Sequence, residues 1–134
     1  MLLTTIHFPG NCDQAITLYK EILGAQVRVI NYFKDAPPEF ANSVDLPPNF
    51  VMHSEISIQG VMLSLTDGAT TSFTEDNYSM MLMFETDEEL KAIFDKFVAA
   101  GGKVIEPIAK QFWASSYGIV TDPFGVMWQM TTMS

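Results

Sequence analysis

A histidine and a glutamate two residues apart are the side chains in this sequence best suited to chemistry. Residues 51–58 alternate with period two, so Ile56 and Ile58 predict a face packed on a helix, while His53 and Glu55 share the other face. This pair could act as a general base and its orienting carboxylate, or as two ligands of a metal ion. A hydrogen-bonded structural pair or a subunit contact fits the same pattern, because such pairs are common on half-buried strands. The residues alone leave these interpretations open.

His7 and Cys12 are two further residues whose side chains could take part in chemistry. His7 falls at the end of a predicted strand, just before Gly10, where capping or surface exposure is its expected role. Cys12 falls in the first turn of a predicted helix, where the helix N-terminus would lower the pKa of its thiol. Its neighbour is Asp13 rather than a base, so the sequence favours a structural cysteine over a nucleophile.

Methionine and aromatic side chains suggest a place for a ligand. The chain contains nine methionines. By strand alternation, Met62, Met81, Met83 and Met127 share faces with the polar positions at Ser64, Ser79 and Gln129. A surface of thioethers is apolar and adaptable and would suit a hydrophobic small molecule, although core packing explains any single methionine as well. Trp113 and Tyr117 could stack on a ligand or fill a dimer interface, where aromatic residues are enriched.

The elements that would position these residues come in two matching sets. Each set contains an amphipathic helix with apolar residues at i, i+3, i+4, i+7 and i+8. These residues are Ala15, Leu18, Tyr19, Ile22 and Leu23 in the first helix, and Leu90, Ile93, Phe94, Phe97 and Val98 in the second. Asn11 with Gln14, and Thr86 with Glu89, have the spacing of helix N-caps. The helices are expected to end at Gly24 and at Gly101–Gly102.

Strand-like runs surround both helices in the same order. The predicted strands are 2–8, 26–33, 50–58 and 61–66 in the first set, and 78–85, 103–108, 116–121 and 126–132 in the second. Gln59-Gly60 predicts a tight hairpin, and residues 122–125 predict a turn with proline second and glycine fourth. The sequence therefore predicts two β-α-β-β-β units, at 1–68 and 78–134.

Two irregular segments interrupt these units. Residues 34–49 hold four of the seven prolines and cannot form a central strand. A lid, a subunit contact and a solvated insertion are all open roles for this loop. Residues 67–77 are polar and are expected to link the units.

Composition narrows the class of partner. The chain has 134 residues, 48% of them hydrophobic, and a formal net charge of −9, which fits one compact domain spanning residues 1–134. Nucleic acids and anionic membranes are poor partners for so acidic a chain, and a single arginine, Arg28, disfavours bidentate clamping of several phosphates. One cysteine and the lack of a signal or membrane segment predict a cytoplasmic protein.

The order of elements and three motifs resemble the vicinal oxygen chelate superfamily, also called the glyoxalase/bleomycin resistance/dioxygenase fold, and its PhnB-like group in particular. The motifs are Gly10-Asn11-Cys12 leading into Ala15 and Tyr19, Val51-Met52-His53-Ser54, and the stretch from Phe112-Trp113-Ala114 to Asp122-Pro123-Phe124-Gly125-Val126-Met127-Trp128. The resemblance covers nearly the whole chain. It implies an α+β fold in which the two units form a curved mixed sheet around a cleft, and it implies a homodimer.

The resemblance also implies where metal ligands should lie. Enzymes of the superfamily place one ligand on the first and fourth strands of each unit, and these positions fall at Thr4, Ser64, Ser79 and Gln129. Hydroxyl groups are poor ligands for zinc or iron, so we expect no metal and no cofactor. A demethylubiquinone methyltransferase activity, with which the group has been labelled, would need a glycine-rich turn after a parallel strand, and the sequence has none.

Two functions remain at the level of sequence, and catalysis is left open. The first is a protein that binds a small apolar or aromatic molecule in its cleft. Its expected ligand-binding residues are Met62, Ser64, Met81, Trp113, Tyr117 and Gln129. The alternative is an enzyme of the lyase, isomerase or dioxygenase class that uses a metal or the acid–base pair His53 and Glu55.

Overall fold

The structure is a computed structural model that describes residues 1–41, 45–68 and 78–133. The chain divides into two compact units, Met1–Ser72 and Phe73–Ser134, and each is described here by itself. The first unit contains β1 (Thr4–Phe8), α1 (Cys12–Leu23), β2 (Gln26–Tyr32), the 3-10 turn η1 (Phe33–Asp35), α2 (Pro38–Ala41), β3 (Val51–Ile58) and β4 (Val61–Asp67). The second contains β5 (Met80–Phe84), α3 (Asp87–Ala99), β6 (Lys103–Gln111), β7 (Ala114–Thr121) and β8 (Met127–Thr132).

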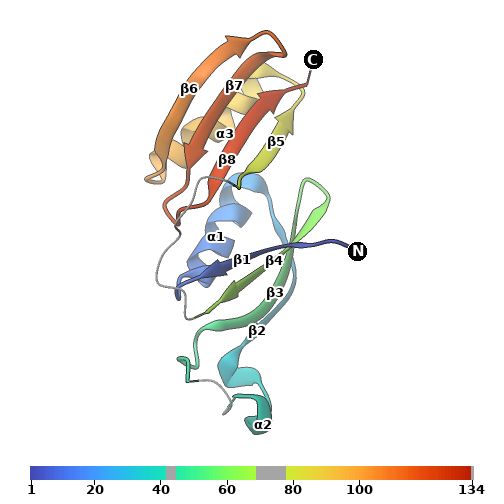
Figure 1. Ribbon diagram of the computed structural model, residues 1–134, viewed down its shortest axis with the longest axis vertical. Coiled ribbons are helices and arrows are strands. Elements are labelled where there is room, and N and C mark those ends of the chain that lie inside the picture. The colour runs from blue at the N-terminus through green and yellow to red at the C-terminus, as the bar shows by residue number, and fades with distance from the viewer. Residues whose placement is uncertain (42–44, 69–77, 134) are drawn as a thin grey trace. The chain divides into compact units, whose positions relative to one another are not determined.

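Each unit folds as a four-stranded mixed sheet. The strand order is β1-β4-β3-β2 in the first unit and β5-β8-β7-β6 in the second. The first strand of each unit pairs in parallel with the last, and the remaining pairs are antiparallel. This confirms the predicted α+β class and the repeated β-α-β-β-β order (Figure 1). The expectations of one domain and of a shared cleft concern how the units combine, and they remain predictions.

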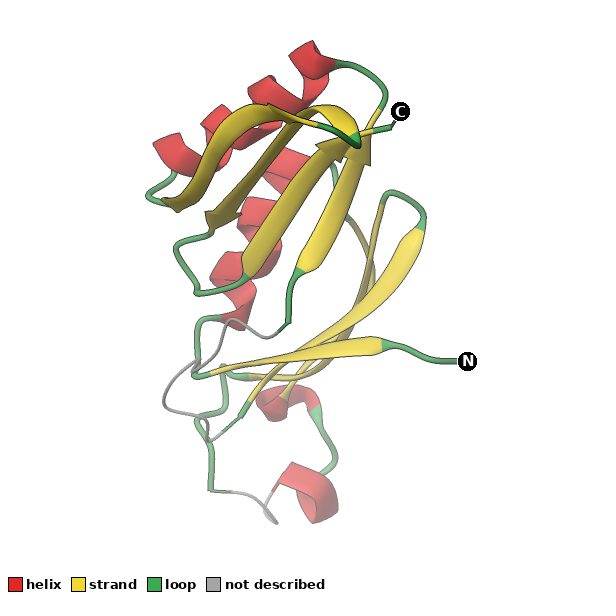
Figure 2. Ribbon diagram, turned by 45° about the horizontal axis from the view of Figure 1, so that its top comes forward, coloured by secondary structure: helices red, strands yellow, loops and turns green. Residues whose placement is uncertain are grey.

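One helix covers one face of each sheet, as Figure 2 shows for α3. Tyr19 of α1 and Phe97 of α3 are fully buried, at the centre of the predicted stripes. Strand alternation divides the side chains between the two faces of each sheet. Phe8 and Ile56 are buried, whereas the side chain of His53 is exposed. The face of each sheet opposite its helix is called the helix-free face below, and it carries most of the residues that could do chemistry.

The turns between strands confirm two predictions from sequence. Gln59 and Gly60 both adopt positive φ, 51° and 79°, as a two-residue type I′ hairpin between β3 and β4 requires. The amide of Gly125 donates to the carbonyl of Asp122 over 3.1 Å, which closes the expected turn between β7 and β8.

Helix capping was predicted correctly at three ends and wrongly at one. Thr86 accepts a hydrogen bond from the amide of Glu89, Gly24 caps α1 in the left-handed conformation, and a positive-φ Gly101 follows α3. Asn11 makes no side-chain cap bond to α1. The amide of Cys12, in the first turn, instead donates to a carboxylate distant in sequence, which satisfies one of the free amides at the start of the helix.

The proline-rich segment contains η1 and α2, two short helical turns, with residues 42–44 outside the described part of the chain. The amide of Lys34 donates to the carbonyl of Pro48 over 2.9 Å, and that of Phe33 donates to Phe50 over 3.0 Å. These bonds bring the two ends of the proline-rich segment together. Most of the expected linker lies at residues 69–77, which are also outside the described residues, while Asp67 ends β4.

Candidate functional site

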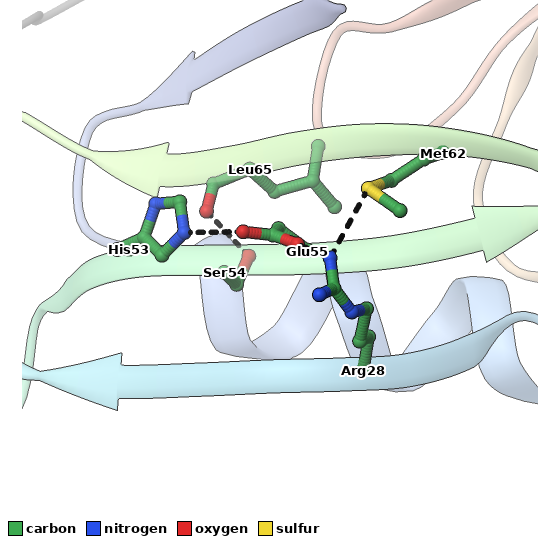
Figure 3. Close-up of polar contacts among 6 residues, drawn as sticks. All are labelled: Arg28, His53, Ser54, Glu55, Met62 and Leu65. Atoms are coloured by element: carbon green, nitrogen blue, oxygen red, sulfur yellow. Dashed lines mark hydrogen bonds and ion pairs between the residues drawn. The ribbon is translucent and has the colours of Figure 1, made fainter.

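Three side chains on the helix-free face of the first sheet form a continuous polar array (Figure 3). Glu55 of β3 accepts from Arg28 of β2 at its Oε1, over 2.5 Å, and contacts Nε2 of His53 at its Oε2, over 2.8 Å. The sulfur of Met62, on β4, lies 3.9 Å from the same guanidinium nitrogen of Arg28. The structure therefore brings the predicted pair together and adds an arginine to it.

The electrostatics of this array keep Glu55 in its charged form. The hydrogen bond to His53 is the main cause that lowers the pKa of Glu55, and the charge of Arg28 lowers it further. Since Glu55 is a carboxylate, the Nε2 atom of His53 must be the donor between them. The other ring nitrogen, Nδ1, is then the basic one, and Figure 3 shows it turned away from Glu55. The side chain of His53 is 47% exposed, so a proton or an ion from solvent can approach it.

The positions that the superfamily uses for metal ligands do not suit a divalent ion. The register of β1 and β4 places Thr4 opposite Leu63 and its neighbour Thr5 opposite Ser64. Either residue offers only a neutral hydroxyl, which compensates poorly for water stripped from the ion. Across residues 1–41, 45–68 and 78–133, no group of three His, Cys, Asp or Glu side chains is placed to hold a metal.

The other two of these positions form a hydrogen-bonded chain in the second unit. The hydroxyl of Tyr117 on β7 donates to Oε1 of Gln129 on β8 over 2.6 Å. Nε2 of Gln129 donates to the hydroxyl of Ser79, just before β5, also over 2.6 Å. Gln129 is thus committed to neighbouring side chains, and the chain of three spans the helix-free faces of three strands.

Apolar side chains surround this chain on the same face. Met81 lies directly across from Gln129, and Met83 lies across from Thr131. The two methionines are 52% and 50% exposed. Trp113, in the loop between β6 and β7, packs its ring edge-on to Tyr117 with centroids 5.4 Å apart. The predicted ligand-binding residues Met81, Trp113, Tyr117 and Gln129 therefore lie in the second unit, whereas Met62 and Ser64 lie on β4 of the first.

The two remaining candidate residues are His7 and Cys12. His7 is exposed, and its Nδ1 lies 2.9 Å from the hydroxyl of Thr66. Cys12 is fully buried, and this burial raises the pKa of its thiol, with Asp67 and Asp13 adding to the effect. A thiol in that setting is a structural group, because the thiolate is the reactive form.

Sequence reasoning missed the partnership of Arg28 with Glu55. A register shift between Val27 and Val29 bulges β2 at Arg28, so two residues of β2 lie opposite Glu55. Opposite charges on two strands were visible in the sequence, but the pairing of those strands and the bulge were not.

The comparisons with known proteins agree with this architecture. Residues 4–130 match the family model of the Glyoxalase/Bleomycin resistance protein/Dioxygenase superfamily, so the chain belongs to that superfamily. Protein YjdN of Escherichia coli (strain K12) is 29% identical to this chain over 136 residues, which cover 96% of this chain and 92% of YjdN. The family predicted from sequence is confirmed.

Solved structures show the same fold. Protein PA1353 from Pseudomonas aeruginosa aligns with a TM-score of 0.83 and 27% identity, covering 99% of this chain and 97% of that one. A protein from Bacillus cereus, described as a putative 3-demethylubiquinone-9 3-methyltransferase, PhnB protein, aligns with a TM-score of 0.81 and 22% identity, covering 98% of each chain. At that identity the likeness shows the fold alone.

The longest helix of the described residues has 13 residues, and none is long and apolar enough to span a membrane.

Proposed function

We propose that this protein binds a small apolar or aromatic molecule on the helix-free face of its second unit. The observation that carries the proposal is a pair of half-exposed thioethers beside a hydrogen-bonded polar chain. Met81 lies across from Gln129, and both it and Met83 expose about half of their surface. Thioethers adapt to irregular ligand surfaces and make favourable contacts with the edges of aromatic rings. Trp113, 44% exposed, adds an aromatic surface beside them.

The polar chain gives such a ligand an orientation. With Tyr117 donating to Gln129 and Gln129 donating to Ser79, the Ser79 hydroxyl hydrogen and the second amide hydrogen of Gln129 can donate outward. The oxygen of Tyr117 can accept. A ligand with a hydroxyl or carbonyl oxygen on an aromatic body would use both properties of the face, because a few placed polar groups in an apolar lining fix orientation.

Nuclear magnetic resonance of methionine methyl groups tests the proposal with 2-naphthol as the probe. The protein has nine methionines, and Met130, which is fully buried, serves as the internal control. We expect 2-naphthol to shift the methyl signals of Met81 and Met83 and to leave that of Met130 in place. Saturating 2-naphthol that leaves both exposed methyl groups unmoved would overturn the proposal.

Variants then separate the polar contacts from the apolar ones. Gln129→Leu and Tyr117→Phe are each expected to weaken 2-naphthol binding by about 3- to 10-fold, the equivalent of one hydrogen bond. Binding of naphthalene, which has no oxygen, should change little in either variant. Met62 and Ser64, the other two residues of the expected ligand-binding set, lie in the first unit, and Met62→Leu and Ser64→Ala test them separately.

The geometry of His53 and Glu55 favours acid–base catalysis as a second candidate function. A carboxylate 2.8 Å from one ring nitrogen fixes the tautomer and leaves the other nitrogen as the base. Kemp elimination of 5-nitrobenzisoxazole needs only a placed base and is therefore a suitable probe. This candidate expects a rate above background that His53→Gln abolishes and Gln129→Leu preserves. Equal rates for the wild type and His53→Gln would exclude it.

We further propose that the chain forms a cytoplasmic homodimer. Support comes from the superfamily resemblance and from Phe112 and Trp113, which are 96% and 44% exposed and pack edge-on with ring centroids 4.8 Å apart. Aromatic side chains exposed to this degree are typical of protein interfaces. Light scattering should give twice the chain mass at micromolar concentration, and Phe112→Ser should shift the mass toward the monomer.

A further inference from the structure

The two histidines of the chain lie in one row on the helix-free face of the first sheet. His7 of β1 pairs directly with Thr66 of β4. The register of β3 and β4 ends with Glu55 opposite Ser64, and His53 and Thr66 each lie two residues beyond that pair on their own strands. Since β4 lies between β1 and β3, Thr66 lies on the strand between the two histidines. All three side chains belong to one face, because paired residues and alternate residues of a strand point to the same side of a sheet.

Each histidine has one ring nitrogen occupied by a neighbour on this face. Nδ1 of His7 lies 2.9 Å from the hydroxyl of Thr66, which makes Nε2 the nitrogen that can face an added ligand. Nε2 of His53 lies 2.8 Å from the carboxylate of Glu55, which makes Nδ1 its available nitrogen. Histidines that ligate metals are typically held in this way, because a partner on the second nitrogen fixes the tautomer and the ring plane.

The spacing of the strands suits a single ion held by both rings. Two strand spacings of about 4.8 Å each separate the backbones of His7 and His53 by roughly 10 Å. A bond of about 2.1 Å from each imidazole lets two histidine side chains meet at an ion above Thr66. The bond from His7 to Thr66 already inclines that ring toward β4.

We propose that His7 and His53 bind one divalent cation of the imidazole-preferring class, Ni²⁺, Cu²⁺ or Zn²⁺, at an exchangeable site over Thr66. Glu55 acts as the positioning residue for His53, and water completes the coordination shell. The site differs from the positions at Thr4 and Ser64 that the superfamily resemblance implies, and it does not depend on the aromatic ligand proposed for the second unit. Two neutral nitrogen ligands hold an ion weakly, so the site fills when metal is added and empties during purification.

Nickel titration followed by nuclear magnetic resonance tests both ligands at once, with NiCl₂ as the probe. The chain has only two histidines, so its ring spectrum has one set of signals for each. Paramagnetic Ni²⁺ should broaden the ring signals of His7 and His53 together, at the same added concentrations. Broadening of one ring alone, or of neither, would overturn the two-histidine site.

Calorimetry on variants provides the second measurement. We expect one Ni²⁺ per chain, with affinity falling by about tenfold or more in His7→Gln and in His53→Gln. Glu55→Gln should also weaken binding, whereas the matched variant Glu88→Gln, on the exposed start of α3, should not. The proposal fails if His7→Gln binds Ni²⁺ as tightly as the wild type, or if Glu88→Gln weakens binding as much as Glu55→Gln, which would mean attraction by net charge alone.

Discussion

A single buried carboxylate ties together three segments of the first unit. Oδ1 of Asp67, at the end of β4, accepts from the amides of Gly10 and Cys12 over 2.9 Å and 3.0 Å. Its Oδ2 accepts from the amide of Val51 over 2.9 Å. Asp67 is 6% exposed, so water does not readily replace it. The carboxylate therefore joins the start of α1 and the start of β3 to the same strand end.

Replacing this carboxylate has a cost that can be worked out from the three bonds. Asp67→Ala leaves the buried amides of Cys12 and Val51 and the part-buried amide of Gly10 without their acceptor. At about 1–3 kcal/mol for each unsatisfied amide, and with partial relief from water at Gly10, the free energy of unfolding should fall by roughly 3–6 kcal/mol. Asp67→Asn keeps one oxygen but presents an amide donor to one side, so we expect a smaller loss of about 1–3 kcal/mol.

Urea denaturation followed by circular dichroism measures both variants against a matched control. Asp95→Asn removes the same charge at an exposed site, where Asp95 pairs with Lys91 one helical turn away. That variant should change the free energy of unfolding by about 0.5 kcal/mol or less. The stabilising role of the Asp67 carboxylate would be refuted by an Asp67→Asn variant as stable as Asp95→Asn. It would also be refuted by an Asp67→Ala variant no less stable than Asp67→Asn.

Three further outcomes follow from the structure. Desolvation, with a 2.8 Å hydrogen bond to Asp13, raises the pKa of Tyr32 to about 12. Absorbance at alkaline pH should therefore show a late tyrosine titration, part of which Asp13→Asn shifts to lower pH. Because the folded state holds this proton more tightly, stability should fall as the pH rises from about 10 toward 12. Cys12, fully buried, should react with a disulfide reagent only as the protein unfolds. Thr86→Ala should destabilise the protein by about 1 kcal/mol in urea denaturation, because it removes the cap on the Glu89 amide.

Local patterns in the sequence predicted most of the fold. Helix periodicity, the left-handed Gly24 and the hairpin at Gln59-Gly60 each depend on neighbouring residues, and each was predicted correctly. The hydrogen bonds of Asp67 join it to Gly10 and Cys12, which are 57 and 55 residues away in the sequence, and no local pattern reveals them.

The candidate site was predictable in part, because strand alternation correctly placed His53 and Glu55 on one face. Alternation cannot show which residues of two strands lie opposite each other, and the expected position at Thr4 lies opposite Leu63 rather than Ser64. Nor can it show which strands adjoin. The link from Gln129 to Ser79, 50 residues apart, follows from the parallel pairing of β5 and β8.

The paired registers of the two units show which positions the repeated architecture fixes. Ile6 with Leu65 and Leu82 with Met130 are equivalent pairs on the helix-facing sides, and all four are buried apolar residues. The equivalent pairs on the helix-free faces are Thr5 with Ser64 and Met81 with Gln129, and they share no chemistry. Packing on a helix constrains the first kind of position and leaves the second free to change. The helix-free face of the first unit is polar and charge-bearing, and that of the second carries thioether and aromatic side chains, so the two faces suit different chemistry.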